Sequence, residues 1–121
     1  MLRLCLAGGA LLVVLGVRYL LVPESAARTF GVPGRPAGYE LHHIVGLRNV
    51  WLGLLVAGLA AWRQWQALAL WFAIGTFVCF ADAAIAASST GRLPQVTFHA
   101  ACGLGCIVLA IAAWRIAGTN R

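Results

Sequence analysis

The residues with the most chemical potential lie at the head of one apolar run. The stretch 39–49 reads Tyr-Glu-Leu-His-His-Ile-Val-Gly-Leu-Arg-Asn, in a chain that otherwise has the composition of a membrane protein. Polar groups are costly in hydrocarbon, so these side chains require partners or a purpose. A histidine such as His42 or His43 can ligate haem iron or shuttle protons at the lip of a membrane pocket. An asparagine two turns deeper, Asn49, can hold a substrate oxygen.

The composition places the chain in a bilayer. Of its 121 residues, 62% are hydrophobic and 10% are charged, whereas a soluble domain has roughly 25% charged residues. The length predicts a single integral membrane domain spanning 1–121. The formal charge of +6 comes from arginines placed singly at the ends of apolar runs. This pattern is typical of topology signals and head-group contacts, so we expect no nucleic-acid partner.

Four apolar segments have the ~20 residues that a membrane-spanning helix needs. They cover about 4–22, 40–62, 67–87 and 96–117. The sequence therefore predicts an all-α, four-helix transmembrane bundle with both termini on the same side. We expect a bacterial inner-membrane protein, and the arginine distribution favours cytoplasmic termini. The many small residues on these helices also favour a homo-oligomer.

The joint between the first two segments has its own signals. Pro33, Gly34, Pro36 and Gly38 are typical of turns and extended backbone. The segment 25–30 before them is expected to form a short interfacial helix.

The order of the segments gathers the polar groups in one half of the bilayer. At ~1.5 Å rise per residue, Asn49 lies roughly 13 Å below Glu40, and Asp82 roughly 9 Å below Ser88. The joint after the first segment and the joint after the third segment lie on the same face of the membrane. We therefore expect the polar side chains near these joints to form one cluster. The expected members are Arg18, His42, His43, Arg48, Asn49, Asp82 and His99.

Each member has a structural and a functional interpretation. Arg48 and Asp82 can form a buried ion pair, and Asn49 can donate a hydrogen bond between helices. In the functional interpretation His43, Asn49 and Asp82 are catalytic, with Asp82 acting as an acid in low dielectric. Arg18, His42, Arg48 and His99 then complete the substrate side of the cluster.

A metal site is not expected. His99, Cys102 and Cys106 follow one helical stripe and have ligand chemistry for a soft metal. Cysteine is, however, a common small packing residue in apolar helices. We therefore predict a packing role for this stripe.

Over nearly its whole length the chain resembles the bacterial four-span family called domain of unknown function 4267. The matching residues are Phe30-Gly31, Gly46-Leu47-Arg48-Asn49, Gly53, Asp82, Gly91 and His99. That family more usually has Arg-Asp where this chain has Arg48-Asn49. The resemblance implies a small membrane protein and no established activity.

A shorter segment is similar to styrene oxide isomerase, a trimeric membrane enzyme whose haem iron acts on an epoxide. The similar residues are Val32-Pro33-Gly34, Pro36, Gly38-Tyr39, His43 and Asn49. This resemblance implies haem ligation by His43 and oxygen binding by Asn49. The tyrosine expected further along has no counterpart in Ser88-Ser89-Thr90.

Two classes of function follow. One is a non-catalytic helper or a subunit that binds a small lipophilic molecule, with lipid as its surroundings. The alternative is a haem-assisted membrane isomerase acting on a small lipophilic epoxide. A proton-coupled transporter is disfavoured, because the chain shows no inverted repeat.

Overall fold

The computed structural model describes residues 1–31, 40–89 and 91–119, and this part of the chain is helical without strands. Its helices are α1 (Leu2–Leu21), α2 (Pro23–Phe30), α3 (Glu40–Ala61), α4 (Trp65–Ser89) and α5 (Leu93–Thr119). All of these except α2 are long and apolar enough to cross a membrane. The predicted all-α fold with four membrane-length helices is therefore confirmed. The turns expected at Pro33, Gly34, Pro36 and Gly38 lie outside the described residues.

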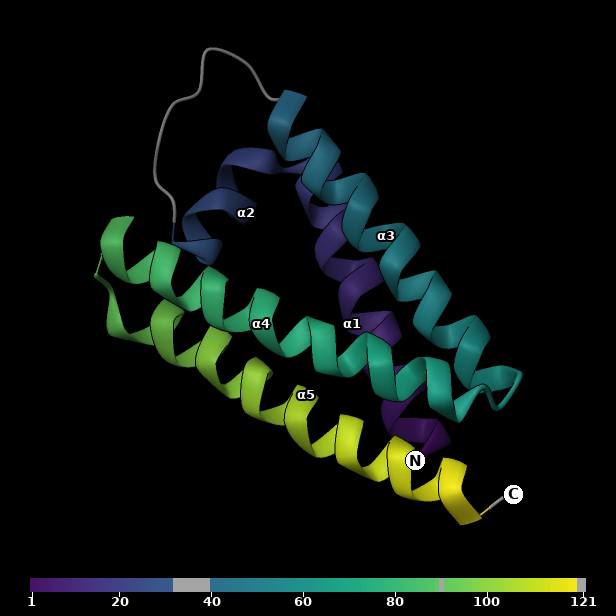
Figure 1. The fold of residues 1–121 in the computed structure, drawn as a ribbon. Coiled ribbons are helices and arrows are strands. Elements are labelled where there is room, and N and C mark those ends of the chain that lie inside the picture. Colours follow the sequence, from purple (N-terminus) through teal and green to yellow (C-terminus); the bar gives the residue numbers. More distant parts are fainter. Residues whose placement is uncertain (32–39, 90, 120–121) are drawn as a thin grey trace.

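The membrane-length helices form two antiparallel pairs (Figure 1). Helix α1 packs along α3 in the N-terminal pair, and α4 packs along α5 in the C-terminal pair. The two pairs meet where α3 turns into α4, which we call the closed end. They diverge toward the open end, where α1 ends, α3 begins and α2 lies between the pairs (Figure 1). Helix α1 begins and α5 ends at the closed end.

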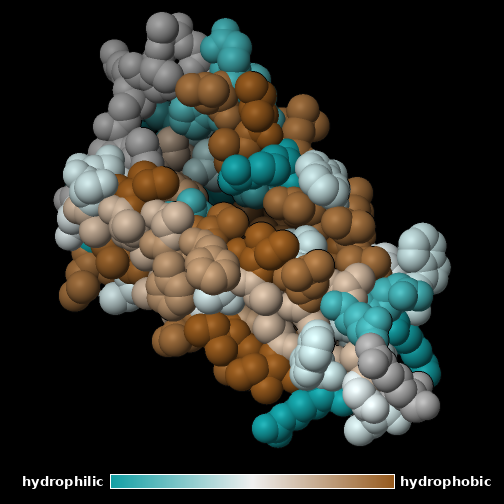
Figure 2. Space-filling view, viewed as in Figure 1, coloured by the Kyte–Doolittle hydropathy of each residue, from teal (hydrophilic) through white to brown (hydrophobic). Residues whose placement is uncertain are grey.

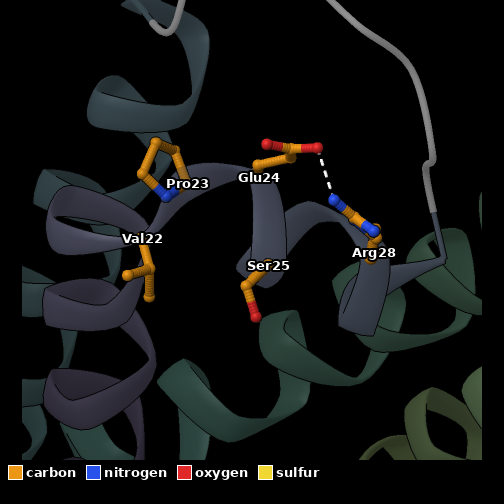
Figure 3. Close-up of a pocket in the computed structure, with 5 residues that line it drawn as sticks. All are labelled: Val22, Pro23, Glu24, Ser25 and Arg28. Carbon is orange, nitrogen blue, oxygen red and sulfur yellow. Dashed lines mark hydrogen bonds and ion pairs between the residues drawn. The ribbon is translucent and has the colours of Figure 1, made fainter.

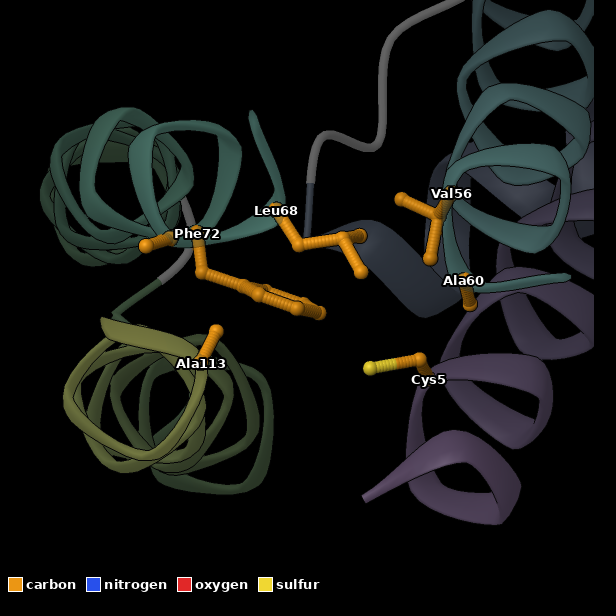
Figure 4. Close-up of a cluster of buried hydrophobic side chains, with 7 residues drawn as sticks. Cys5, Val56, Ala60, Leu68, Phe72 and Ala113 are labelled. Carbon is orange, nitrogen blue, oxygen red and sulfur yellow. The ribbon is translucent and has the colours of Figure 1, made fainter. Parts of the chain in front are cut away.

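A small hydrophobic core joins the two pairs at the closed end (Figure 4). Phe72 and Leu68 of α4 project toward the N-terminal pair, where Cys5 and Val56 are almost completely buried. The remaining buried members are Ala60, Ala69 and Ala113. Since this core occupies one end only, it fixes the junction of the pairs and leaves their other ends apart.

Four glycines bring α1 and α3 into backbone contact. Gly9 faces Gly53, and Gly16 faces Gly46, and the two glycines on each helix are seven positions apart in the sequence. A Cβ added to Gly53 would lie 2.4 Å from the carbonyl oxygen of Gly9, and one added to Gly16 would lie 2.5 Å from that of Gly46. Only glycine permits this approach. Close packing through small residues is a common way for membrane helices to associate.

In the C-terminal pair, larger side chains of one helix pack on glycines of the other. The ring of Phe80 covers Gly103, where an added Cβ would lie 3.1 Å from the ring. One turn away, the sulfur of Cys106 lies against Gly75. Helix α5 begins at Leu93, before the apolar segment 96–117, because Pro94 is tolerated in a first helical turn.

Helix α2 bridges the two pairs at the open end. Proline at its first position begins the helix, and Gly31, with a φ of 103°, ends it in the left-handed conformation. A Cβ at Gly31 would lie 3.2 Å from Ala86 of α4 and from Gln95 of α5. The expected short helix at 25–30 is thus present and begins two residues earlier. It is held against the C-terminal pair.

Candidate functional site

Polar side chains from all the helices gather in the half of the molecule nearest the open end. At ~1.5 Å rise per residue, Arg18 lies roughly 5 Å from the end of α1, and Arg48 roughly 12 Å from the start of α3. By the same measure Asp82 lies roughly 10 Å from the end of α4, and His99 roughly 9 Å from the start of α5. We call these four residues and Tyr19 the open-end cluster. The sequence predicts that these ionisable groups lie in one half of the bilayer, and that prediction was based on the same order of helices.

Arg18 ties α1 to α2. Its guanidinium donates hydrogen bonds of 2.9 Å to the hydroxyls of Ser25 and Thr29. Thr29 in turn donates to the carbonyl oxygen of Ser25. The i, i+4 spacing places both hydroxyls on one face of α2. These two hydroxyls were not among the predicted site residues, although their spacing beside an arginine is visible in the sequence.

His99 ties α5 to α2. It is 6% exposed, and its Nε2 donates a 3.1 Å hydrogen bond to the carbonyl oxygen of Phe30. The His99 ring also packs on the ring of Phe30, with centroids 4.4 Å apart. This carbonyl lies at the end of α2, where helix carbonyls lack intrahelical partners. The histidine therefore has a clear structural role at the junction of α2 and α5.

His42 and Tyr19 meet between α3 and α1. Their ring centroids are 6.1 Å apart, and Tyr19 is 8% exposed. Tyr19 also lies within electrostatic reach of Arg18, Arg48 and Asp82. Tyr19 was missed at the sequence level, because an aromatic residue near the end of an apolar segment is usually read as an interfacial anchor.

Asp82 is half-buried, and it interacts electrostatically with His99 and Arg48. The expected direct Arg48–Asp82 ion pair is absent from the part of the chain that the structure describes, where Arg28 pairs with Glu24. The two residues belong to different helix pairs, and these pairs diverge at this level. Arg48 and Asp82 thus lie within electrostatic range of each other without forming an ion pair.

Asn49 and His43 lie on α3 beside this cluster. Asn49 is half-buried next to the glycine contact, and within residues 1–31, 40–89 and 91–119 no hydrogen bond from its side chain to another helix is present. The expected interhelical hydrogen bond of Asn49 is therefore not found there. His43 is exposed and lies about 100° around the helix from His42. Its assignment as a haem ligand, and the catalytic roles of Asn49 and Asp82, stay predictions.

The space between the pairs is visible as a hollow (Figure 2). Hydrophilic residues lie in the hollow between α3 and α4, and hydrophobic residues border it on both sides. A separate cavity of about 360 Å³ lies at the corner of α1 and α2 (Figure 3). Its charged residues, Glu24 and Arg28, form an ion pair with each other, so they are already neutralised. The hollow is the better candidate for binding.

The described residues contain no group of three or more His, Cys, Asp or Glu side chains arranged to hold a metal ion. Cys79 and Cys106 interact with each other between α4 and α5. With Cys106 packed on Gly75, these cysteines serve as small packing groups.

The comparison with known families agrees with this architecture. The family model described as Domain of unknown function (DUF4267) matches residues 9–115, from the first glycine contact to the last turns of α5. The chain belongs to this family. The predicted family membership is thus confirmed. The four membrane-length helices indicate an integral membrane protein. No curated protein and no solved structure matches this DUF4267 chain.

Proposed function

We propose that this protein is a non-catalytic membrane subunit that binds a small lipophilic molecule in the hollow between its two helix pairs. The ligand's apolar part would lie against the hydrophobic borders of the hollow, and its polar end would reach the open-end cluster (Figure 2). Most ligand sites combine an apolar lining with a few convergent polar groups, and the spaces between helices are common places for them.

The separation of Arg48 from Asp82 carries this proposal. Each is an ionisable group within an apolar helix, and they interact through space without a direct ion pair. Asp82 is half-buried and Arg48 is exposed on α3, and charges at membrane depth are costly unless they are paired or hydrogen-bonded. A polar group bound beside Arg48 would satisfy its guanidinium in place of a direct ion pair with Asp82.

The packing within each pair supports a preformed site. Backbone contact at Gly16 and Gly46 fixes α1 against α3 close to the level of Arg48. The bonds from Arg18 and His99 hold α2 between the pairs. The hollow is therefore bounded by elements that are fixed to one another, so a ligand can bind without ordering them first.

We also propose, as the sequence predicts, that this subunit forms a homo-oligomer. No more than 22% of the hydrophobic stretch of each membrane-length helix is buried within one chain. The outer faces are therefore available to lipid or to a second copy. Cross-linking in the native membrane, before detergent extraction, would measure self-association.

Photolabelling with a long-chain alcohol that carries a diazirine tests the proposal. We expect saturable labelling near Arg48 and Asp82, which an excess of the unlabelled alcohol reduces. Labelling of outer-face residues such as Leu54 and Ile111, which are 61% and 52% exposed, should not saturate. Equal, unsaturable labelling of both groups would contradict a binding site in the hollow.

A further inference from the structure

We infer that the ligand is a monoanionic amphiphile, with its negative head group held by Arg48 at the open end. This inference rests on the proposed function and adds the ligand's charge. It follows from the balance of charges around the hollow and from the partners that each charged group already has.

Two permanent positive charges face one carboxylate among the described residues of the open-end cluster. Arg18 and Arg48 are the positive groups, and Asp82 is the negative one. The remaining described acids of this end are engaged or lie at its edge. Glu24 pairs with Arg28, and Glu40 is the exposed first residue of α3. The cluster therefore has one positive charge in excess.

The hydrogen-bond partners of Arg18 do not neutralise its positive charge. The groups that accept its hydrogen bonds, in Ser25 and Thr29, are neutral hydroxyls. These bonds fix the direction of the guanidinium and leave a net positive charge close to Tyr19. An anion bound near Arg48 would thus be attracted by both arginines, since charges interact strongly where water is scarce.

Arg48 is the residue with donors to spare. Within residues 1–31, 40–89 and 91–119 its side chain makes no hydrogen bond or ion pair, and it is exposed on α3. It lies roughly 12 Å from the start of the helix, which is deep enough for an unpaired charge to be costly. A guanidinium presents a planar fork of donors that matches a carboxylate or a phosphate diester.

Asp82 limits the negative charge that the site can hold. A monoanion neutralises the excess, whereas a dianion would leave a second negative charge near Asp82. His99 is already bonded to Phe30, so it is not needed to bind the anion. Two sources share the required chemistry: a single-chain carboxylate such as a fatty acid, and a two-chain phosphodiester lipid.

Matched amphiphiles test the charge of the ligand. Dodecanoate, dodecanol and dodecyltrimethylammonium have the same chain length and differ in head-group charge. We would measure how each competes with the photoreactive alcohol in the wild-type protein purified in a mild nonionic detergent. We expect dodecanoate to compete at least tenfold more effectively than dodecanol, and the ammonium compound to compete least.

Arginine variants test the assignment to Arg48. Arg48→Gln should remove the advantage of dodecanoate over dodecanol, and Arg48→Lys should retain part of it because the charge remains. Arg115→Gln changes an exposed arginine near the end of α5, at the closed end, and should have no effect. Retention of the tenfold advantage in Arg48→Gln would overturn the assignment. Because Arg48→Lys keeps the charge, it reports on the site even if Arg48→Gln fails to fold.

The two lipid sources are separated in nanodiscs. Stronger competition by phosphatidylglycerol than by either phosphatidylcholine or dodecanoate would support a two-chain lipid as the anion. The reverse would support a single-chain carboxylate. Equal competition by dodecanoate and dodecanol would overturn the inference while leaving lipophile binding intact. Absence of saturable labelling by the alcohol would instead refute the proposed function itself.

Discussion

Replacement of Gly53 by alanine should push the N-terminal pair apart. The added Cβ would lie 2.4 Å from the carbonyl oxygen of Gly9, whereas ordinary contacts begin at 3.4 Å. The atom in the way belongs to the backbone, so it cannot rotate aside, and α1 must move by about 1 Å relative to α3. Overpacking of this kind typically costs about 1–3 kcal/mol.

Gly58 provides the matched control on the same helix. A Cβ at Gly58 would have nothing within 4 Å, so Gly58→Ala removes a flexible residue without a clash. Such a change in a helix is expected to stabilise by about 0.5–1 kcal/mol. The two alanine variants should therefore differ in stability by about 1–3 kcal/mol, the cost of the clash, since both gain the same helix propensity.

Unfolding in a mild detergent, followed by circular dichroism during titration with sodium dodecyl sulfate, would measure this difference. The double variant with Gly9→Ala should cost less than the sum of the single changes, because one separation of the helices relieves both clashes. If Gly53→Ala were as stable as Gly58→Ala, the backbone contact would not hold the pair together. The account of the N-terminal pair would then be wrong.

Three further predictions concern the open end. Arg18→Gln should destabilise the protein by about 1–3 kcal/mol through the loss of charged hydrogen bonds to α2, and faster backbone hydrogen exchange across α2 would report it. Arg48→Ala and Asp82→Ala should show a coupling energy below about 1 kcal/mol in a double-mutant cycle, because no direct ion pair joins the side chains, and a larger coupling would refute their separation. If His43 ligates haem, purified protein should show a Soret band that shifts on reduction by dithionite and is lost in His43→Ala. If protein supplied with haem showed only the absorption of the polypeptide, the haem-assisted isomerase would be excluded.

The sequence was sufficient to predict the helices and the family. Apolar runs of membrane length have few alternatives to a helix, because the bilayer offers no partner for an unpaired backbone group. The pairing of Gly46 and Gly53 with Gly16 and Gly9 of α1 was not predicted, since pairing depends on which glycines come into register across two helices.

The details of the polar site were less predictable. Order and length placed Arg48 and Asp82 at similar depths, and the structure brings them within electrostatic reach. Their separation depends on the angle between the helix pairs, which the core around Phe72 and α2 determine together. No local pattern encodes that angle. The contacts of Ser25 and His99 with neighbouring elements were missed for the same reason.

The divergence of the helix pairs also affects the surrounding lipids. The molecule is broader at the open end than at the closed end (Figure 1). In a bilayer it therefore takes up more lateral area in one leaflet than in the other. Lipids in the leaflet around α2 must surround a larger perimeter, while those in the opposite leaflet pack around a narrower body. The elastic energy of the bilayer around such a tapered protein is lowest where the bilayer curves toward the narrow end of the protein.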